Sequence, residues 1–522
     1  MGETRDLLLR KGDYVFGSFV KPERVDGYIN AVNPGDRSDV LGRFPFSEAS
    51  TDEALEVAQI GFRTWRRVTL NDRVTIIKRF RDGLNRAQER LARLMTRETG
   101  RPLWETRQEV VASARAIDLF LDEGVAALSP RVIDEIGARS DRLPRGVAAI
   151  LAPYTFPLLT PTTQVAAALL AGCSVVFKPS KYTPGTGQCI ADLIDHCRLP
   201  RGTFNLVQGP GSVIGQRIVS SPNIDLLLFS GSYATAQAIR QATSGRPELP
   251  MVLQTGGKGM AVVLEDAELD RAVYEVMVGA FLSAGQRHTS TARVFVHERL
   301  YPAFVENLVR RSRQLTLGYG MNADTFLGPL ISEAQRNRYR RFSRALLAAG
   351  HEALLEAAQD TPEGRKGFYA RPAIFRVAWE RGNPFLDDEP PGPVLLVYRV
   401  SGWEEAADLH NQAAFRGATS VFSRLENPVL YELKDRLRTG TLNINRATIG
   451  ASLRMPSVGL GRSSNGASAG IDLLAALTSP RAQLIESRPF DQQMKLPGTQ
   501  WGDDEDTTLG TGARPGAQVP AE

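Results

Sequence analysis

Hydrophobic residues change their spacing along the chain, and this change predicts the order of its elements. Residues 1–45 carry short apolar stretches around the turn Asn33-Pro34-Gly35, which indicates short strands and turns. Beyond them, apolar residues recur at helical spacing from Ala54 to Trp65. Ser50-Thr-Asp-Glu53 has the spacing of a capping box, so a helix is predicted to begin there. Further helical stretches are predicted over residues 71–97 and 106–121.

From Gly146 onward, short apolar runs alternate with helix-like segments. The runs are residues 147–151, 174–177, 204–207, 225–229 and 260–264. A strand that is apolar along its whole length is buried on both faces, which is typical of a parallel sheet covered by helices. A second alternating region extends from residue 289 to about residue 422. The pattern therefore predicts an α/β fold with two lobes.

Composition limits the class of protein more than its function. Of 522 residues, 42% are hydrophobic and 23% are charged. A chain of this kind can bury a large core, which excludes a disordered chain, a collagen and a disulfide-stapled miniprotein. Cys173, Cys189 and Cys197 form neither a zinc spacing nor a disulfide framework, so a reducing compartment fits. Cys173 lies in an apolar run and is predicted to be a buried thiol.

The charge distribution and the targeting signals argue against nucleic-acid and membrane partners. The net charge is +5, and 54 of the 63 basic residues are arginines scattered among Asp and Glu. No basic stripe is interleaved with aromatic residues, which argues against a nucleic-acid partner. The N-terminus lacks the apolar core of a signal peptide, and the longest apolar run, 165–177, is shorter than a membrane span of about 20 residues. A cytoplasmic protein without a membrane partner is predicted, with residues 499–522 as a disordered tail.

Individual motifs remain ambiguous on spacing alone. Gly209, Gly211 and Gly215 follow a predicted strand and open a helix, where glycines let a backbone approach a phosphate. A plain tight turn explains them equally well, because their spacing departs from the dinucleotide fingerprint. Four of the five histidines have no partner at metal-ligand spacing: His196, His297, His351 and His410. Surface or core roles, and no metal site, are predicted for them. No spacing reveals a nucleophile.

Taken in order, however, many segments resemble the aldehyde dehydrogenase superfamily, from about residue 12 to about residue 498. Ala152-Pro-Tyr-Thr-Phe-Pro157 resembles the family's Pro-Trp-Asn-Phe-Pro. The other matching segments are Glu98-Thr-Gly-Arg-Pro-Leu-Trp-Glu105, Ala168-Leu-Leu-Ala-Gly172, Phe177-Lys-Pro-Ser180, Phe229-Ser-Gly-Ser232, Gly328-Pro-Leu-Ile-Ser332, Gly392-Pro393 and Asn443-Ile-Asn445. Gly285-Gln-Arg287, Gly450-Ala-Ser452 and Ser463-Ser-Asn465 look most like the succinylglutamate semialdehyde dehydrogenases.

The resemblance implies a domain plan and a reaction. It implies a Rossmann-like cofactor-binding domain over 1–130 and 147–253 and a catalytic-type α/β domain over 254–475. An oligomerisation β element would combine 131–146 with 476–498, and family members are usually dimers or tetramers. Their reaction is the NAD(P)-dependent oxidation of an aldehyde to an acid, through a cysteine thiohemiacetal and thioester.

The sequence departs from the family at the three positions that carry this reaction. His288 stands where the family has its nucleophilic cysteine, and a neutral imidazole is a poorer nucleophile than a thiolate. Gln254 replaces the general base Glu, and an amide cannot accept a proton from water. Thr155 replaces the oxyanion-binding Asn, and losing a good donor there costs about 3 kcal/mol of transition-state stabilisation.

At the cofactor positions the match is mixed. The resemblance assigns cofactor contacts to Lys178, Ser180, Gly211, Gly215, Gly231, Ser232 and Glu389. Lys181 replaces the family's ribose-binding Glu, and an ammonium favours a 2′-phosphate, so NADP is expected over NAD if a nucleotide binds. Pro391 and Ser457 replace two phenylalanines near the nicotinamide, and Ala236 replaces a glycine of the phosphate-binding helix.

Three hypotheses follow from the combined losses. The favoured one is a catalytically inactive, oligomeric binding or scaffold protein, because a fold can persist after its chemistry is lost. The second is a semialdehyde dehydrogenase that works by an atypical mechanism through His288. The third is a different reaction in the same pocket, with His288 as acid or base. A protein partner for the acidic segment 503–506 is left open, with improved solubility as the favoured role.

Overall fold

The computed structural model describes residues 12–360, 362–378, 384–487, 489 and 498. The chain forms two compact units, Met1–Ser129 with Asp141–Arg481, and Pro130–Ser140 with Ala482–Glu522. The predicted disordered tail at 499–522 lies outside the described residues.

The first unit contains a seven-stranded sheet whose parallel part is doubly wound. Its strand order is β11-β10-β7-β8-β9-β1-β2. The parallel strands are β7 (Val147–Leu151), β8 (Ser174–Lys178), β9 (Phe204–Leu206), β10 (Leu226–Ser230) and β11 (Met251–Gln254). The connections diverge between β7 and β10. In such sheets ligands bind outside the carboxyl ends of the strands at this switch point.

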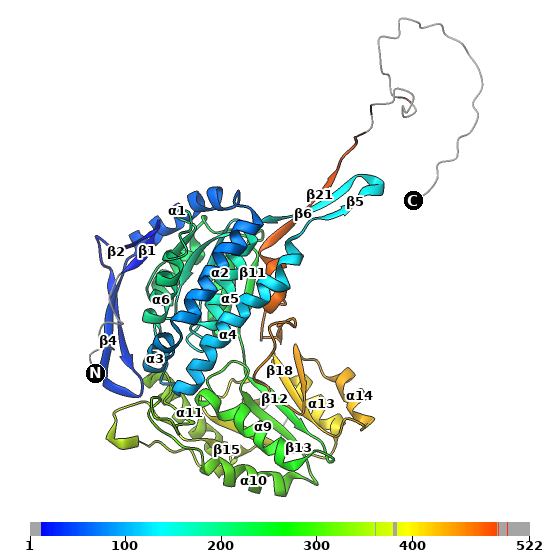
Figure 1. The fold of residues 1–522 in the computed structure, drawn as a ribbon. Helices are drawn as coiled ribbons and strands as arrows, with labels where there is room; N and C mark the ends of the chain where they lie inside the picture. Colours follow the sequence, from blue (N-terminus) through cyan, green and yellow to red (C-terminus); the bar gives the residue numbers. More distant parts are fainter. Residues whose placement is uncertain (1–11, 361, 379–383, 488, 490–497, 499–522) are drawn as a thin grey trace, which may run out of the picture. The chain divides into compact units, whose positions relative to one another are not determined.

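Helices cover both faces of this sheet, as the apolar strands predict. One face packs against α2 (Leu70–Arg86), α3 (Gln88–Thr99), α4 (Leu103–Asp122), α5 (Leu159–Ala171) and α6 (Pro184–Asp195). The other packs against α1 (Glu48–Trp65), α7 (Gln216–Ser220) and α8 (Tyr233–Ala242). Figure 1 shows α2, α4 and α5 lying together in front of the strands.

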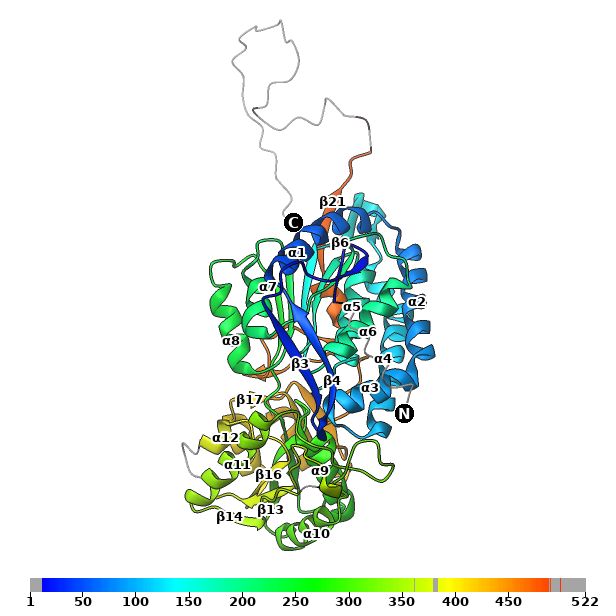
Figure 2. The ribbon, with the colours of Figure 1, turned by 90° about the vertical axis from the view of Figure 1, so that its left-hand side faces the viewer.

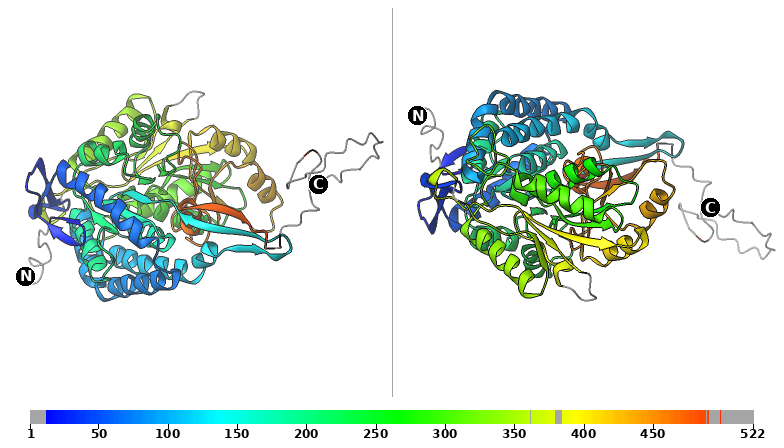
Figure 3. Two further views of the ribbon diagram at one scale, coloured as in Figure 1. Left: turned by 90° about the horizontal axis from the view of Figure 1, so that it is seen from above. Right: turned by 90° about the horizontal axis from the view of Figure 1, so that it is seen from below.

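A second seven-stranded sheet lies in the same unit. Its order is β14-β15-β16-β13-β12-β18-β19, and all neighbours are parallel except β14 and β15. The strands are β12 (Gly259–Val263), β13 (Thr291–His297), β14 (Glu352–Leu355), β15 (Ala373–Arg376), β16 (Val394–Val400), β18 (Ala418–Phe422) and β19 (Thr441–Ile444). Its core includes residues of α9 (Leu269–Phe281), α10 (Tyr301–Arg313), α11 (Glu333–Ala348), α13 (Trp403–Gln412) and α14 (Val429–Arg436). Seen from below, α9 and α10 lie across it (Figure 3).

Two features join the sheets. The chain passes directly from β11 to β12 through residues 255–258. The hairpin of β3 (Gly27–Asn33) and β4 (Asp36–Phe46) extends from the first sheet to the second, as Figure 2 shows. At its turn, the amide of Phe368 donates to the Pro34 carbonyl at 2.9 Å and Tyr369 Oη donates to the Gly35 carbonyl at 3.0 Å. The two α/β lobes are therefore one packed body.

The second unit is small. In it β5 (Arg131–Ile133) pairs antiparallel with residues 138–140 of β6 (Ala138–Pro144). The amide of Ile485 donates to the Gly137 carbonyl at 3.0 Å. The boundary between the units falls within β6 and within β21 (Thr478–Leu484), the strands predicted to belong to an oligomerisation element. Within the described residues, no helix is long and apolar enough to cross a membrane.

Three local predictions need correction. Helix α1 begins at Glu48 and not at Ser50, because the Ser47 side chain accepts the Ser50 amide at 3.3 Å and caps the helix one turn earlier. The stretch predicted over 71–97 is two helices that meet at Ala87. The apolar run 260–264, which resembles the four runs before it, belongs to the second sheet as β12. Burial on both faces looks the same in either sheet, so the pattern could not assign it.

Candidate functional site

A cavity of the first unit, which we call the main cavity, lies at the carboxyl ends of β7, β10 and β11 and the amino ends of β13, β18 and β19. Its volume is about 750 Å³. Seven predicted site residues line it: Thr155, Ser180, Gly231, Ser232, Gln254, His288 and Glu389. The remaining four, Lys178, Lys181, Gly211 and Gly215, are not among its lining residues. The fold thus brings the expected reaction positions and part of the expected cofactor positions to one place.

Strained backbone and close glycine contacts place His288 at the cavity wall. Ser283 and Ala284 have left-handed backbones with φ of 58° and 52°, a conformation that costs a side-chain-bearing residue energy. A Cβ at Gly285 would lie 2.3 Å from the Gly392 carbonyl oxygen, and one at Gly256 would lie 2.7 Å from the His288 Cβ. Only glycine permits these approaches, so Gly256 and His288 lie in direct contact.

The His288 side chain is exposed and lines the cavity. The ring packs edge-on against Phe156, with centroids 6.1 Å apart. Removal from bulk water lowers the pKa of His288 to about 4, and the charge of Arg287 lowers it in the same direction. The imidazole is therefore neutral near pH 7 and carries a free lone pair.

The positions of the expected base and oxyanion donor hold neutral polar groups. Gln254 ends β11, and its Nε2 donates to the Ala467 carbonyl at 3.1 Å. Thr155 follows β7, and its carbonyl accepts from Arg101 Nη1 at 3.2 Å. Neither side chain can take up a proton near neutral pH. We call the part of the cavity lined by Thr155, Gln254 and His288 its reaction end, and the part lined by Ser232 and Glu389 its cofactor end. The reaction end has no carboxylate at the place where the family has its base.

A buried ionic network supports this end of the cavity. Arg101 Nη1 contacts Glu105 Oε1 at 3.3 Å, and Arg287 Nη2 contacts the same oxygen at 2.9 Å. Arg101 also pairs with Glu109, whose Oε1 accepts the amides of Leu158 and Leu159 at 2.9 Å each. Burial acts to raise the pKa of Glu105, but Arg101 and Arg287 outweigh it and hold the pKa below its usual value. The two arginines are thus neutralised within the protein.

At the cofactor end, Ser232 caps α8. Its Oγ accepts the Thr235 amide at 3.2 Å, and Gly231, Ser232 and Thr235 all line the cavity. A helix N-terminus of this kind supplies amide donors and positive potential to an anion. Glu389 also lines the cavity, and its carbonyl accepts from Arg338 Nη2 at 3.0 Å.

The other predicted cofactor residues lie outside this cavity. The Lys178 ammonium donates to the carbonyls of Pro179 and, at 3.2 Å, of Gly209. Burial lowers the pKa of Lys178 to about 8, and the charge of Lys181 adds to the shift. A Cβ at Gly215 would lie 3.8 Å from Lys178 Cε, whereas Gly211 is exposed, with no atom within 4 Å of such a Cβ. Of these residues, Lys178 and Gly215 are buried and Gly211 is exposed.

Lys181 is exposed, with its Nζ 5.2 Å from the centre of the Tyr182 ring. Tyr182 stands edge-on to Tyr154, with centroids 5.7 Å apart, and both rings line the cavity. Ser180 Oγ accepts the Tyr182 amide at 3.3 Å. The position that the resemblance assigns to a ribose-binding carboxylate therefore carries an exposed cation beside the Tyr182 ring.

Thiols and other histidines lie elsewhere. Among the described residues, no cysteine lines the cavity, and Cys173, Cys189 and Cys197 are buried in the core of the first sheet's lobe. Burial raises the pKa of all three thiols, to about 12 for Cys189 and Cys197. His410 is buried, and its Nε2 lies 2.7 Å from Thr419 Oγ1, as expected for a satisfied core histidine. The described residues contain no group of three or more His, Cys, Asp or Glu that could hold a metal.

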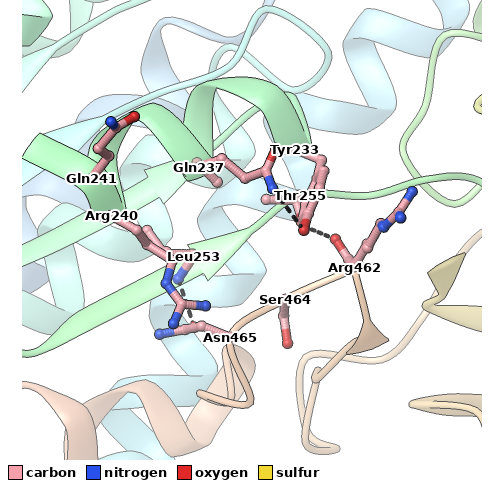
Figure 4. Close-up of a pocket in the computed structure, with 10 residues that line it drawn as sticks. Tyr233, Gln237, Arg240, Gln241, Leu253, Thr255, Arg462, Ser464 and Asn465 are labelled. Atoms are coloured by element: carbon pink, nitrogen blue, oxygen red, sulfur yellow. Dashed lines mark hydrogen bonds between the residues drawn. The ribbon is translucent and has the colours of Figure 1, made fainter. Parts of the chain in front are cut away.

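A smaller recess of about 440 Å³ lies beside α8 (Figure 4). Figure 4 shows Arg240 extending toward Asn465, while Thr255 and Arg462 meet through a side-chain-to-carbonyl hydrogen bond. Thr255 lines both hollows, but the recess contains none of the predicted site residues. The main cavity is therefore the candidate site.

Comparison with known proteins agrees with this geometry. Residues 19–482 match the aldehyde dehydrogenase family. The chain belongs to this family. Over 441 residues it is 32% identical to the N-succinylglutamate 5-semialdehyde dehydrogenase of Paraburkholderia xenovorans (strain LB400), covering 83% of this chain and 88% of the relative. It is 29% identical over 458 residues to the alpha-ketoglutaric semialdehyde dehydrogenase of Bacillus subtilis (strain 168), covering 87% and 93%.

The structural likeness extends over nearly the whole chain. The NAD+ complex of an aldehyde dehydrogenase from Bacillus cereus superimposes with a TM-score of 0.87 at 25% identity, covering 94% of this chain and 99% of the other. Both the resemblance and the predicted fold class are confirmed. In this aldehyde dehydrogenase fold, His288, Gln254 and Thr155 line the main cavity.

Sequence reasoning missed two features of the site. The first is the ionic network of Arg101, Glu105, Glu109 and Arg287, although Glu105 and Glu109 are spaced to share one helix face. The second is Lys258, which lines the cavity. Its location depends on the crossing from β11 to β12, which residue spacing does not show.

Proposed function

We propose that this aldehyde dehydrogenase family protein binds a pyridine nucleotide and aldehyde-sized ligands without oxidising them. One observation carries the proposal: a neutral imidazole, His288, stands where the family has its nucleophile, and no cysteine lines the cavity within the described residues. Hydride transfer from an aldehyde requires a tetrahedral adduct on a nucleophile. A thiolate is well suited to form that adduct, and the thiols of this chain are buried away from the cavity.

The two other substitutions act in the same direction. Gln254 has no basic oxygen to accept the proton of a hydrolytic water, so an acyl intermediate would have no general base at this position. Thr155 offers a single, shorter donor to a developing oxyanion. Nucleophilic attack, activation of water and stabilisation of the oxyanion are thus all weakened, and restoring one of them would leave the other two impaired.

For the nucleotide we propose NADP over NAD. Ser232 at the start of α8 would hold the pyrophosphate, Glu389 the nicotinamide ribose, and Lys181 a 2′-phosphate on the adenosine ribose. The capped helix end that opens into the cavity fits such a group. When bound, the nicotinamide would supply a hydride acceptor. In this proposal no residue of the cavity forms the adduct from which a hydride would be transferred.

We further propose that the chain forms a homo-oligomer, a dimer or a tetramer, through residues 131–146 and 476–498. An oligomeric binding protein has no need of turnover. Light scattering of the full chain tests this, and a monomer at all concentrations would refute it.

A second candidate function rests on the state of His288. Because the ring is neutral and exposed to the cavity, it could attack a carbonyl or act as a base, so an atypical semialdehyde dehydrogenase remains the alternative. The replacement His288→Ala distinguishes the non-oxidising binding protein from the atypical dehydrogenase. It would abolish nicotinamide reduction in the atypical enzyme and would change nothing measurable in the binding protein.

Titration calorimetry of the purified protein with NADP and then with NAD tests the proposal. We expect NADP to bind more tightly than NAD. If neither nucleotide binds, the nucleotide part of the proposal is wrong. If an aldehyde panel then yields reduced nicotinamide in a His288-dependent manner, the non-oxidising part is wrong.

A further inference from the structure

Lys258 brings a primary amine to the wall of the main cavity. The sequence contains nine lysines, and among the described residues Lys258 is the only one that lines this cavity. Its side chain is 5% exposed, and its Nζ donates to the Gly392 carbonyl at 2.8 Å. This hydrogen bond holds the amine beside the segment that carries Glu389.

The backbone fixes Lys258 next to His288. The Lys258 amide donates to the His288 carbonyl at 3.0 Å, so the two residues share one part of the wall. Lys258 has a left-handed backbone, with φ of 63°, directly after two glycines that are also left-handed. Such a conformation persists only where the surroundings impose it, and it turns the side chain toward the cavity segment at Gly392.

Burial favours the neutral form of the Lys258 amine. Glu389, Arg338 and Arg293 are the charged groups that act on it. Burial lowers the pKa of Lys258 to about 7; Arg338 and Arg293 add to this effect, and Glu389 opposes it. A large share of this amine is therefore a free base at neutral pH, whereas a lysine in water has a pKa of about 10.4.

We propose that Lys258 captures small aliphatic aldehydes as a reversible imine. The inference rests on the proposed non-oxidising function. The Nζ lone pair attacks the carbonyl carbon to give a carbinolamine. The carbinolamine then loses its oxygen as water, taking both amine protons with it, and a C=N bond forms. One aldehyde and one amine give one imine and one water, so no oxidant or reductant is consumed and water releases the aldehyde again.

The test uses the full-length protein, butyraldehyde as the probe and sodium cyanoborohydride to trap the imine. Peptide mapping by mass spectrometry should place one butyl group per chain on Lys258 at neutral pH. Exposed lysines such as Lys366 should be labelled at least about tenfold less, because only a small fraction of a surface amine is unprotonated there. Labelling of the exposed lysines should rise steeply toward alkaline pH, and that of Lys258 should change little.

Matched variants complete the test. Lys258→Arg should lose the neutral-pH label, and Lys366→Arg should keep it. If Lys258→Arg does not fold, the peptide map of the unmodified chain decides. Labelling spread over exposed lysines, with Lys258 unmodified, would overturn the inference. A parallel sample with NADP and no reductant reports nicotinamide reduction: its appearance contradicts the proposed function, whereas an unlabelled Lys258 without reduction contradicts the imine alone.

Discussion

The two ends of one cavity differ in how closely their residues match the motifs of the family. At the cofactor end, Ser232 and Glu389 match the family, Ser232 capping α8 and Glu389 lining the cavity, whereas Lys181 replaces a glutamate. At the reaction end, His288, Gln254 and Thr155 line the wall in place of the nucleophile, base and oxyanion donor. The same backbone supports both ends, including the glycine contact between residues 256 and 288. We infer from this difference that the geometry of the site has been maintained while the atoms at its reaction positions have changed.

The comparison is sharpened by the ionic network under the reaction end. Arg101 and Glu105 are buried, Arg287 is partly buried and pairs with Glu105, and Glu109 anchors the first amides of α5. Removing such a network would leave charges unpaired in the core. The network therefore has a structural role at this end of the cavity.

The largest expected effect comes from restoring the chemistry. The triple variant Thr155→Asn, Gln254→Glu, His288→Cys should oxidise aldehydes at least about 10⁴-fold faster than the unmodified chain, since a general base and an oxyanion donor each contribute about 10²-fold or more. Absorbance of reduced nicotinamide measures it. The double variant that keeps His288 is the control and should stay at the background rate. A triple variant that folds, binds nucleotide and remains inactive would show that the reaction end has lost more than three side chains.

The next effect is on stability. Arg101→Met should lower the free energy of unfolding by about 3–5 kcal/mol, because it leaves the buried charge of Glu109 without its cationic partner and Glu105 with Arg287 alone. Chemical denaturation measures it. Arg93→Met is the matched control, since its pair with Glu89 is exposed and should be worth at most about 1 kcal/mol. Equal losses in both variants would contradict the structural role assigned to the network.

At the cofactor end, Lys181→Glu should reverse the nucleotide preference. Exchanging the cation for a carboxylate removes attraction for a 2′-phosphate and adds repulsion, so the ratio of NADP to NAD affinity should fall at least about tenfold, or about 1.4 kcal/mol. Calorimetric titration with both nucleotides gives the ratio. Lys434→Glu, on α14 of the other lobe, is the control for net charge. An unchanged ratio would remove Lys181 from the nucleotide site.

The smallest effect concerns the helix cap. Ser232→Ala removes the acceptor for the Thr235 amide and should lower stability by about 1 kcal/mol. NADP should bind several-fold more weakly to this variant, because the loop at the start of α8 is less fixed. Thermal melts with and without NADP measure both effects. If stability falls while NADP affinity does not, the capped end of α8 does not contact the nucleotide.

Much of the fold could be read from the sequence. The apolar runs at 147–151 and 174–177 are strands, because strands buried on both faces leave a continuous apolar signal. The start of α1 could not be read correctly, because Ser47 and Ser50 are both good caps and only the fold decides which one meets the helix. Whether residues 260–264 join the first or the second sheet depends on where the chain crosses after β11. Local sequence patterns do not encode this crossing.

The site was predictable where motifs fix single positions and hidden where distant segments meet. Family motifs place His288, Gln254 and Thr155 in one cavity, and the structure brings all three to it. The contact of Arg287 with Glu105 joins residues 182 positions apart, and spacing along the chain carries no signal for it. Lys258 likewise gains its significance from the Gly392 carbonyl, 134 positions away.

The central claim is that nucleotide binding has outlasted oxidation, and a stoichiometric assay tests it most directly. Concentrated unmodified protein, shown by calorimetry to hold NADP, is mixed with excess butyraldehyde, and reduced nicotinamide is followed by absorbance for hours. The account predicts bound NADP and less than one reduced nicotinamide per chain, with His288→Ala indistinguishable from the unmodified protein. A burst of one reduced nicotinamide per chain, or steady turnover that His288→Ala abolishes, would contradict it.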